Sequence, residues 1–199
     1  MPSIHPAILL LEYESIAVGI AAADAMAKRA SLAELRLGTV QPGKFLILAA
    51  GDVGPLDEAR TAATELARPA DCVFLPDVDR AVVAALTKTS KRSGEALGIV
   101  ETRTVAGLLQ VADGGVKGAA VTIATLRLAD GLGGKGYLLF SGVLHQVEAA
   151  MDSAIASLAH PEVVLEQRLI AQLDDEVWAN LAQTPLFYTT VKAAMLETT

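Results

Sequence analysis

The chain has little of what several classes of protein need. It carries one cysteine, Cys72, so no internal disulfide can form, which fits a reducing compartment. Lys and Arg number 16 against 23 Asp and Glu, which gives a formal net charge of −7. Because neutralising phosphates requires clustered Lys and Arg, and no such cluster is present, nucleic acid is not an expected partner.

Long apolar runs are also missing. No apolar stretch approaches the roughly 20 residues that a membrane-spanning helix needs. The opening "MPSIHPAILLLEYES" has no basic segment ahead of its short apolar run, so we expect no signal peptide. These absences favour a cytoplasmic protein without a membrane partner.

Catalytic and metal-binding patterns are sparse as well. The only histidines, His5, His145 and His160, do not have the spacing of metal ligands. In "PADCVFLP" no basic neighbour would activate Cys72, which we interpret as a small buried apolar residue. A dyad of Cys72 with a histidine stays an alternative without local support. We predict no catalytic residue, no metal site and no cofactor.

An internal repeat dominates what is present. "ILLLEYESIAVGIAAADAMAKRA" (8–30) aligns with "LGIVETRTVAGLLQVADGGVKGA" (97–119) at an offset of 89 residues. Further along the offset becomes 91, as in 142 − 51 for two glycines. The chain is therefore predicted to hold two copies of one module, as domains 1–90 and 95–199. The polar stretch "TKTSKRSGE" (87–95) is typical of a linker.

Each copy predicts the element order β-α-β-β-α-β-α. Short apolar runs predict the strands, and Ser15 and Thr104 stand where N-caps of the first helices belong. Ile16, Ile20, Ala23 and Ala27 are predicted as the buried stripe of the first helix. The expected strands are 8–13, 32–40, 44–50 and 71–75, then 97–101, 121–129, 136–141 and 163–170; the later helices are a segment with Pro55 at its first position, 77–88, 144–159 and 174–183. This order predicts an α+β fold of two tandem modules, each a mostly antiparallel sheet with helices packed on it.

A Gly-Lys pair between two strands occurs in both copies, as "QPGKF" and "GLGGKG" (131–136). A phosphate-binding P-loop would need Ser or Thr after the lysine and a following helix, but Phe45 and a strand follow Lys44. The second loop fits G-x-G-x-x-G but also precedes a strand, so a dinucleotide site is not expected. We interpret both as tight turns. A duplicated ligand-binding module that uses residues 131–136 as an anion loop stays an alternative.

Several polar or aromatic residues are interpreted as structural. Glu12 and Glu101 occupy the same position in the two copies, and we expect this carboxylate to accept a hydrogen bond from backbone at a subunit contact. The i,i+4 spacing predicts ion pairs from Asp24 to Lys28 and from Asp113 to Lys117. Trp178, the lone tryptophan, is predicted to anchor the last helix by packing.

These motifs resemble the shell domain of bacterial microcompartments. "ALGIVETRTVAGLLQVADGGVKGAAV" matches that domain's strand ending in Gly-x-x-Glu-Thr and its helix ending in Ala-Asp-x-x-x-Lys. "GKFLILAAGDVG" resembles its strand after the pore loop, with the Gly-Asp-Val-Gly turn. The resemblance covers both copies and nearly the whole chain. The tandem order is similar to trimer-forming shell proteins, and most of all to the non-permuted tandem subgroup of propanediol-utilisation type.

The resemblance implies a structural shell protein and not an enzyme, located in a microcompartment of the bacterial cytoplasm. Three chains would form a disc-shaped pseudohexamer whose central pore passes small polar metabolites, and two such discs, with six chains, could stack. Other shell proteins and encapsulated enzymes would be partners. Lys28 and Lys117 match the family's edge lysine, which lies between tiles. The matching pore residues are Thr39, Val40, Gln41, Pro42, Gly43, Asp130, Gly131, Leu132, Gly133 and Gly134.

Two departures from the family pattern matter. Similar tandem proteins carry a cysteine just before Pro-Gly-Lys and hold an iron–sulfur cluster in the pore, but this chain has Gln41 there. Because a cluster needs thiolates, we predict a ring of three Gln41 amides instead. A redox or metal-carrying tile with its centre elsewhere stays an alternative. The family's Pro-Arg-Pro-His edge motif is degraded to "LPDVDR" (75–80) and "IAQLDD" (170–175), so packing into sheets is expected to be weaker or specific to a partner.

Overall fold

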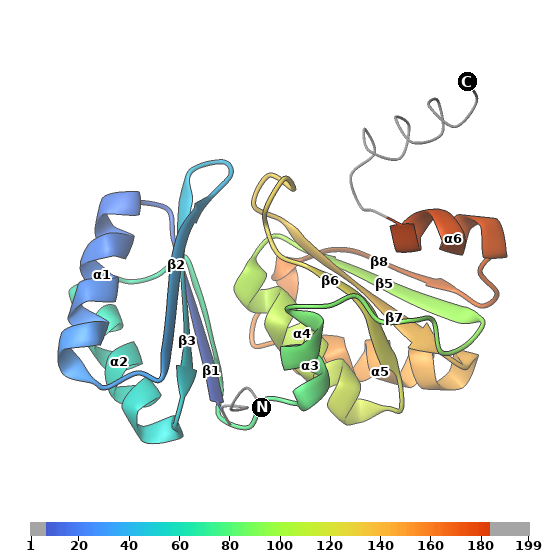
Figure 1. The fold of residues 1–199 in the computed structure, drawn as a ribbon, viewed down its shortest axis with the longest axis horizontal. Coiled ribbons are helices and arrows are strands. Elements are labelled where there is room, and N and C mark those ends of the chain that lie inside the picture. Colours follow the sequence, from blue (N-terminus) through green and yellow to red (C-terminus); the bar gives the residue numbers. More distant parts are fainter. Residues whose placement is uncertain (1–6, 184–199) are drawn as a thin grey trace.

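The computed structural model describes residues 7–183 and shows two modules with the same order of elements (Figure 1). The first module contains β1 (Ala7–Tyr13), α1 (Ile16–Arg29), β2 (Glu34–Val40), β3 (Lys44–Gly51), α2 (Val53–Leu66), β4 (Asp71–Leu75) and α3 (Arg80–Ala85). The second contains β5 (Ala96–Thr102), α4 (Val105–Gly118), β6 (Thr122–Arg127), β7 (Gly136–Gly142), α5 (Leu144–Ala156), a 3-10 turn (Pro161–Val163), β8 (Val164–Ile170) and α6 (Asp175–Gln183). The predicted fold class and element order are confirmed. The domain limits at 90 and 95 stay a prediction.

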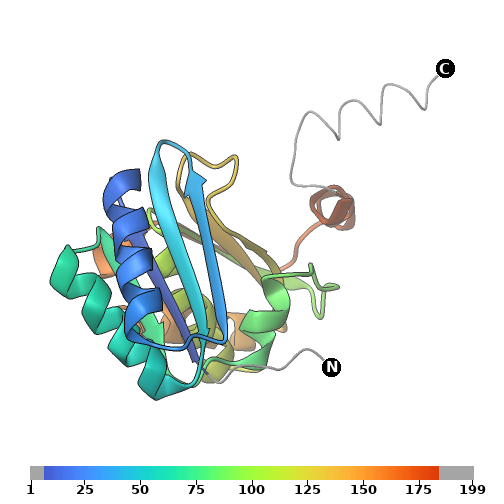
Figure 2. The same cartoon turned by 60° about the vertical axis from the view of Figure 1, so that its left-hand side comes forward.

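Each module is built on a four-stranded antiparallel sheet. The strand orders are β2-β3-β1-β4 and β6-β7-β5-β8, so the first strand of each module lies inside its sheet. Helices α1 and α2 cover one face of the first sheet, and α4 and α5 cover one face of the second (Figures 1 and 2). Every residue of β1 is buried, so the first sheet is covered on both faces.

Local capping patterns place the helix starts. The Ser15 hydroxyl accepts a hydrogen bond from the Val18 N–H at 3.4 Å, and the Thr104 hydroxyl accepts one from the Gly107 N–H at 3.1 Å, which confirms both predicted N-caps. The prediction of Pro55 as the first residue of its helix is wrong, because α2 begins two residues earlier, at Val53. Proline is tolerated there because the first four N–H groups of a helix have no partner within it.

The predicted buried stripe of α1 is also wrong, except for Ala23. The helix turns Gly19, Ala22, Ala23 and Met26 towards its own sheet, whereas Ala27 is exposed. These residues are small or flexible, and a Cβ on Gly19 would come within 2.5 Å of Phe45, so the helix lies very close to the sheet. The larger Ile16 and Ile20 point away from it and are 39% and 54% exposed.

Candidate functional site

The helix α4 joins the two modules. One of its faces packs on its own sheet and another packs on β1 and β4 of the first module. At the offset of 89 residues, Val105 and Leu109 of α4 correspond to Ile16 and Ile20 of α1, and both are fully buried. They share an apolar core with residues of the first sheet, including Ile8, Leu10 and Leu75. The same helix face is therefore buried between modules in α4 and exposed in α1.

A buried carboxylate completes this joint. Glu12 of β1 accepts a hydrogen bond at Oε1 from the Ala106 N–H, in the first turn of α4, at 2.7 Å. Lys44 Nζ lies 3.6 Å from Oε2. Burial raises the pKa of Glu12 above its ordinary value, and the facing Asp71 adds to this, whereas the Ala106 hydrogen bond and Lys44 act in the opposite direction. The prediction that Glu12 accepts a hydrogen bond from backbone is confirmed, but the contact lies between two modules of one chain and not between subunits.

Substituting Glu12 should separate its hydrogen bond from its charge. Glu12→Ala removes the acceptor of a buried N–H and should lower the free energy of unfolding by about 1–3 kcal/mol. Glu12→Gln keeps an acceptor oxygen and should cost less. Because burial raises the folded-state pKa, the stability that the protonated Glu12 carboxyl contributes is present at acid pH and lost as pH rises through that pKa.

Urea unfolding of the three proteins across pH 4 to 8 would measure these effects. Wild type should lose stability relative to Glu12→Gln as pH rises above the ordinary glutamate pKa of 4.5. A constant difference over this range would contradict the role of the Glu12 charge. Equal costs for the alanine and glutamine variants would contradict the role of the hydrogen bond.

Two acid–base pairs lie on the corresponding helices. Lys28 binds Asp24 at 2.6 Å, with exposed side chains of 75% and 59%, and Lys117 binds Asp113 at 2.7 Å, which confirms both predicted i,i+4 pairs. The Asp113 side chain is only 8% exposed. It lies against the start of α3 and also accepts a hydrogen bond from the Asp79 N–H there. Lys117 donates to a backbone carbonyl in the same segment, at position 77. The role of both lysines between tiles stays a prediction.

The two predicted pore loops lie side by side. The β2–β3 and β6–β7 hairpins reach the same end of the molecule in both views (Figures 1 and 2). A Cβ on Gly134 would lie 2.8 Å from the Gln41 carbonyl oxygen, so the loops approach each other closely. Gly131, Gly133 and Gly134 have φ of +73°, +63° and +82°, which confirms a turn that needs positive φ. Thr39, Val40, Gln41, Pro42, Gly43, Asp130 and Gly131 line a hollow of about 490 Å³.

Both Gly-Lys lysines turn back towards carboxylates of their own module. Lys44 lies 3.6 Å from Glu14 as well as from Glu12, and Lys135 lies 3.3 Å from Glu101. The strands β3 and β7 follow these loops, so neither loop leads directly into a helix N-terminus. The geometry therefore makes the lysines part of the sheet architecture and does not favour an anion loop at 131–136.

The donor groups at the loops do not fit an iron–sulfur cluster. Gln41 offers only an amide. Cys72 lies on the edge strand β4, opposite Leu11 of β1, and β1 separates it from β3 and its loop. Burial raises the pKa of the Cys72 thiol to about 11, so the thiolate that a metal needs is disfavoured. Within residues 7–183, no three His, Cys, Asp or Glu side chains gather as metal ligands, and His145 and His160 are exposed. His5 lies outside the described residues.

The apolar face shared by α1 and α4 was not among the predicted site residues. The sequence signal that could have revealed this face is a pair of larger apolar residues in each helix, beside the small residues that face the sheet. The pairs are Ile16 with Ile20 and Val105 with Leu109. No described helix combines the length and the hydropathy needed to cross a membrane.

Comparisons with known proteins agree with this architecture. The BMC domain model matches the chain twice, at residues 7–78 and 96–173. The bacterial microcompartment shell protein PduT of Citrobacter freundii is 35% identical over 182 residues, which cover 89% of this chain and 98% of PduT. A crystal structure of a microcompartments protein from Desulfitobacterium hafniense is 32% identical, with a TM-score of 0.74, and the match covers 87% of this chain and 98% of that one. The fused permuted hexameric shell protein MSM0275 shares the fold at 19% identity, with a TM-score of 0.57 and coverage of 78% and 82%.

Proposed function

The chain belongs to the BMC-domain family of bacterial microcompartment shell proteins, and from this premise we propose that three copies close into a ring of six modules around a central pore. Membership agrees with the predictions of a structural protein, not an enzyme, and of a location in a microcompartment shell. Proteins of this family oligomerise and assemble with other shell proteins. The ring, its pore and its specific partners are the proposal.

The burial of one helix face carries this proposal. Leu109 is fully buried because α4 packs on the sheet of the first module, whereas its counterpart Ile20 is 54% exposed on α1. The second module has the matching sheet face beneath α6, formed around Leu97 and Ile99, the counterparts of Ile8 and Leu10. Placing α1 of a second copy on this face would repeat the joint already present inside the chain.

Polar groups support the same match. In the second module Glu101 occupies the position of Glu12 and is paired with Lys135, as Glu12 is with Lys44. Among the described residues, however, no backbone N–H donates to Glu101 as Ala106 does to Glu12. The corresponding donor would be the N–H of Ala17, in the first turn of α1 of the next chain.

Repeating this joint gives a ring. The surface on α1 differs from the surface on the second sheet, so the contact is head-to-tail and closes only at a fixed number of modules. We propose six modules, from three chains, and the family resemblance supports this number. Covalent fusion lets the ring carry two kinds of loop in alternation while keeping three-fold symmetry.

The loops would then surround the symmetry axis. Gln41 and Asp130 are exposed in the hollow between the two hairpins, so a ring would bring three amides and three carboxylates near one axis. Such a constriction would pass small polar metabolites by offering hydrogen bonds, and its carboxylates would disfavour anions. Lys28 and Lys117 remain the proposed contacts with neighbouring tiles.

The mass of the assembly in solution tests the ring. Light scattering behind a sizing column should give about three times the 20.7 kDa of one chain, or six times for two stacked discs. Electron microscopy of the same fraction should show discs. A protein that stays at the mass of one chain at every concentration would overturn the proposal.

A further inference from the structure

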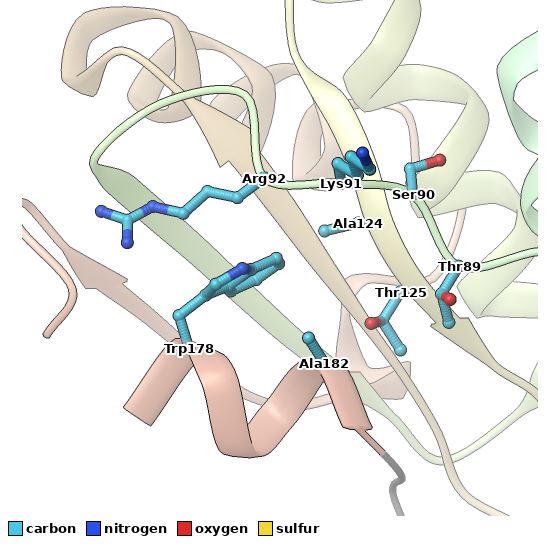
Figure 3. Close-up of a pocket in the computed structure, with 8 residues that line it drawn as sticks. All are labelled: Thr89, Ser90, Lys91, Arg92, Ala124, Thr125, Trp178 and Ala182. Atoms are coloured by element: carbon cyan, nitrogen blue, oxygen red, sulfur yellow. The ribbon is translucent and has the colours of Figure 1, made fainter. Parts of the chain in front are cut away.

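The helix α6 lies over the face of the second sheet that the proposed ring requires. The side chain of Trp178 points from α6 towards the sheet, beneath Arg92 and beside Ala124 (Figure 3). It packs against an apolar cluster on the side of the sheet away from α4 and α5 (Figure 1). The cluster consists of Leu97, Ile99, Ala124, Tyr137, Leu139, Ile170 and Leu173.

The same face in the first module is covered differently. Ile8, Leu10 and Leu48 share a core with α4, and they correspond to Leu97, Ile99 and Leu139 at offsets of 89, 89 and 91 residues. A helix of another module thus covers the first face, whereas the last helix of the same module covers the second. Trp178 occupies a surface that a ring would give to α1 of the neighbouring chain.

The counterpart of α6 in the first module is α3, which packs on the second module. Asp79 caps α3 by accepting from the Ala81 N–H, and Asp174 accepts from the Glu176 N–H in the same way, an offset of 95 residues. After this cap α3 crosses to the second module and packs on β6 and α4. Val82 of α3 is fully buried by this crossing.

On α6 the corresponding apolar side is exposed. Val177, the counterpart of Val82, is 48% exposed, and Leu181, the counterpart of the partly buried Leu86, is 42% exposed. These two residues are four apart and so lie on one side of the helix. The helix therefore presents to solvent the positions that α3 buries against the next module.

The attachment of α6 to its own module is incomplete. Arg92 pairs with Asp175 at 2.8 Å, but the Asp175 side chain is 96% exposed, so this ion pair stabilises little. A cavity of about 340 Å³ remains between α6, the linker and β6, lined by residues that include Thr89, Thr125 and Ala182 (Figure 3). Trp178 is thus the main apolar contact of a loosely packed cover.

We propose that α6 is a displaceable cover of the second sheet, which leaves when α1 of a second copy docks there. The helix then crosses to that copy and buries Val177 and Leu181 against its α1 and β2, as α3 does within the chain. This inference rests on the proposed ring. Assembly is consequently a competition between α6 and the incoming α1 for one face, so the strength of the cover sets the concentration at which rings form.

A reversible cross-link tests the competition directly. Thr125→Cys and Ala182→Cys, in a chain with Cys72→Ser, place thiols on two sides of the cavity under α6. A cleavable bis-maleimide should lock the cover and hold the chain as a monomer, and cleavage should restore the ring. The control is the same chain treated with N-ethylmaleimide. A locked chain that assembles as readily as this control would overturn the inference, whereas a control that never forms a ring would overturn the proposed function.

A milder variant gives a second readout. Trp178→Val introduces the residue that α3 carries at the corresponding position, Val83, so it weakens the cover and keeps a side chain suited to the crossed position. Sedimentation should show half-assembly at a concentration lower by about tenfold. An unchanged or higher concentration would contradict the inference. In the wild type the fluorescence of Trp178, the one tryptophan of the chain, should shift on assembly, and an unchanged spectrum would also contradict it.

Discussion

Replacing Ile20 by Arg should convert the assembled protein into a folded monomer. Ile20 is 54% exposed in the single chain, so an arginine there can remain in water and should leave folding almost unchanged. In the proposed ring the same side chain would enter the apolar face around Leu97, Ile99 and Ile170. Burying an unpaired charge should cost about 3 kcal/mol or more at each joint, and each of the three joints between chains would carry that cost. Light scattering at micromolar protein should therefore give one chain mass.

Two matched variants make this result specific. Leu66→Arg places the same charge on another exposed apolar residue, at the end of α2. Among residues 7–183, every hydrogen bond of its counterpart Ser157 stays within the second module, so this variant should still assemble. Leu109→Arg changes the corresponding residue of the joint inside the chain and should impair folding itself, measured as a loss of cooperative unfolding. If Ile20→Arg assembles like Leu66→Arg, the docking of α1 on a second copy is wrong.

The contrast between Ile20 and Leu109 also marks how far the sequence could predict the structure. Element order follows from local patterns, such as apolar runs for strands and the Ser15 and Thr104 caps, and these patterns recur in both copies. Local patterns do not show which face of α1 packs on the sheet. The helix has two apolar faces, and an argument from periodicity selects the one with the bulkier side chains. Close packing of Gly19 against Phe45 assigns the small-residue face to the sheet instead.

The candidate site shows the same limit. The loop residues could be named from the motifs around the Gly-Lys pairs, because turns that need positive φ are rich in glycine. That Gly134 meets the Gln41 carbonyl depends on how α4 holds the two modules, which no pattern within one module contains. The position of α6 could not be predicted either, because its sequence matches α3 at the cap, but α6 lies on its own sheet whereas α3 packs on the other module.

Replacing Gln41 by Cys should allow three chains to be joined at one point. Gln41 is exposed at the tip of the β2–β3 hairpin, beside the second loop, and occurs once in each chain of the proposed ring. Three-fold symmetry would place the three side chains around one axis, equidistant from each other. In a chain with Cys72→Ser, a three-armed maleimide should therefore give a product of three chains on a denaturing gel. The Cys72→Ser background removes the only native thiol.

A control cysteine separates the axis from general proximity. Glu58→Cys lies on the exposed side of α2, which packs on the face of the first sheet opposite the intermodule joint, so its thiols should give only single-chain adducts. Ile20→Arg combined with Gln41→Cys should lose the three-chain product, since the ring would be absent. If intact trimers of Gln41→Cys give only single-chain adducts, the hairpins do not surround the axis, and the pore must be assigned to other residues. A three-chain product would instead make Gln41 and Asp130 the groups that any crossing metabolite meets.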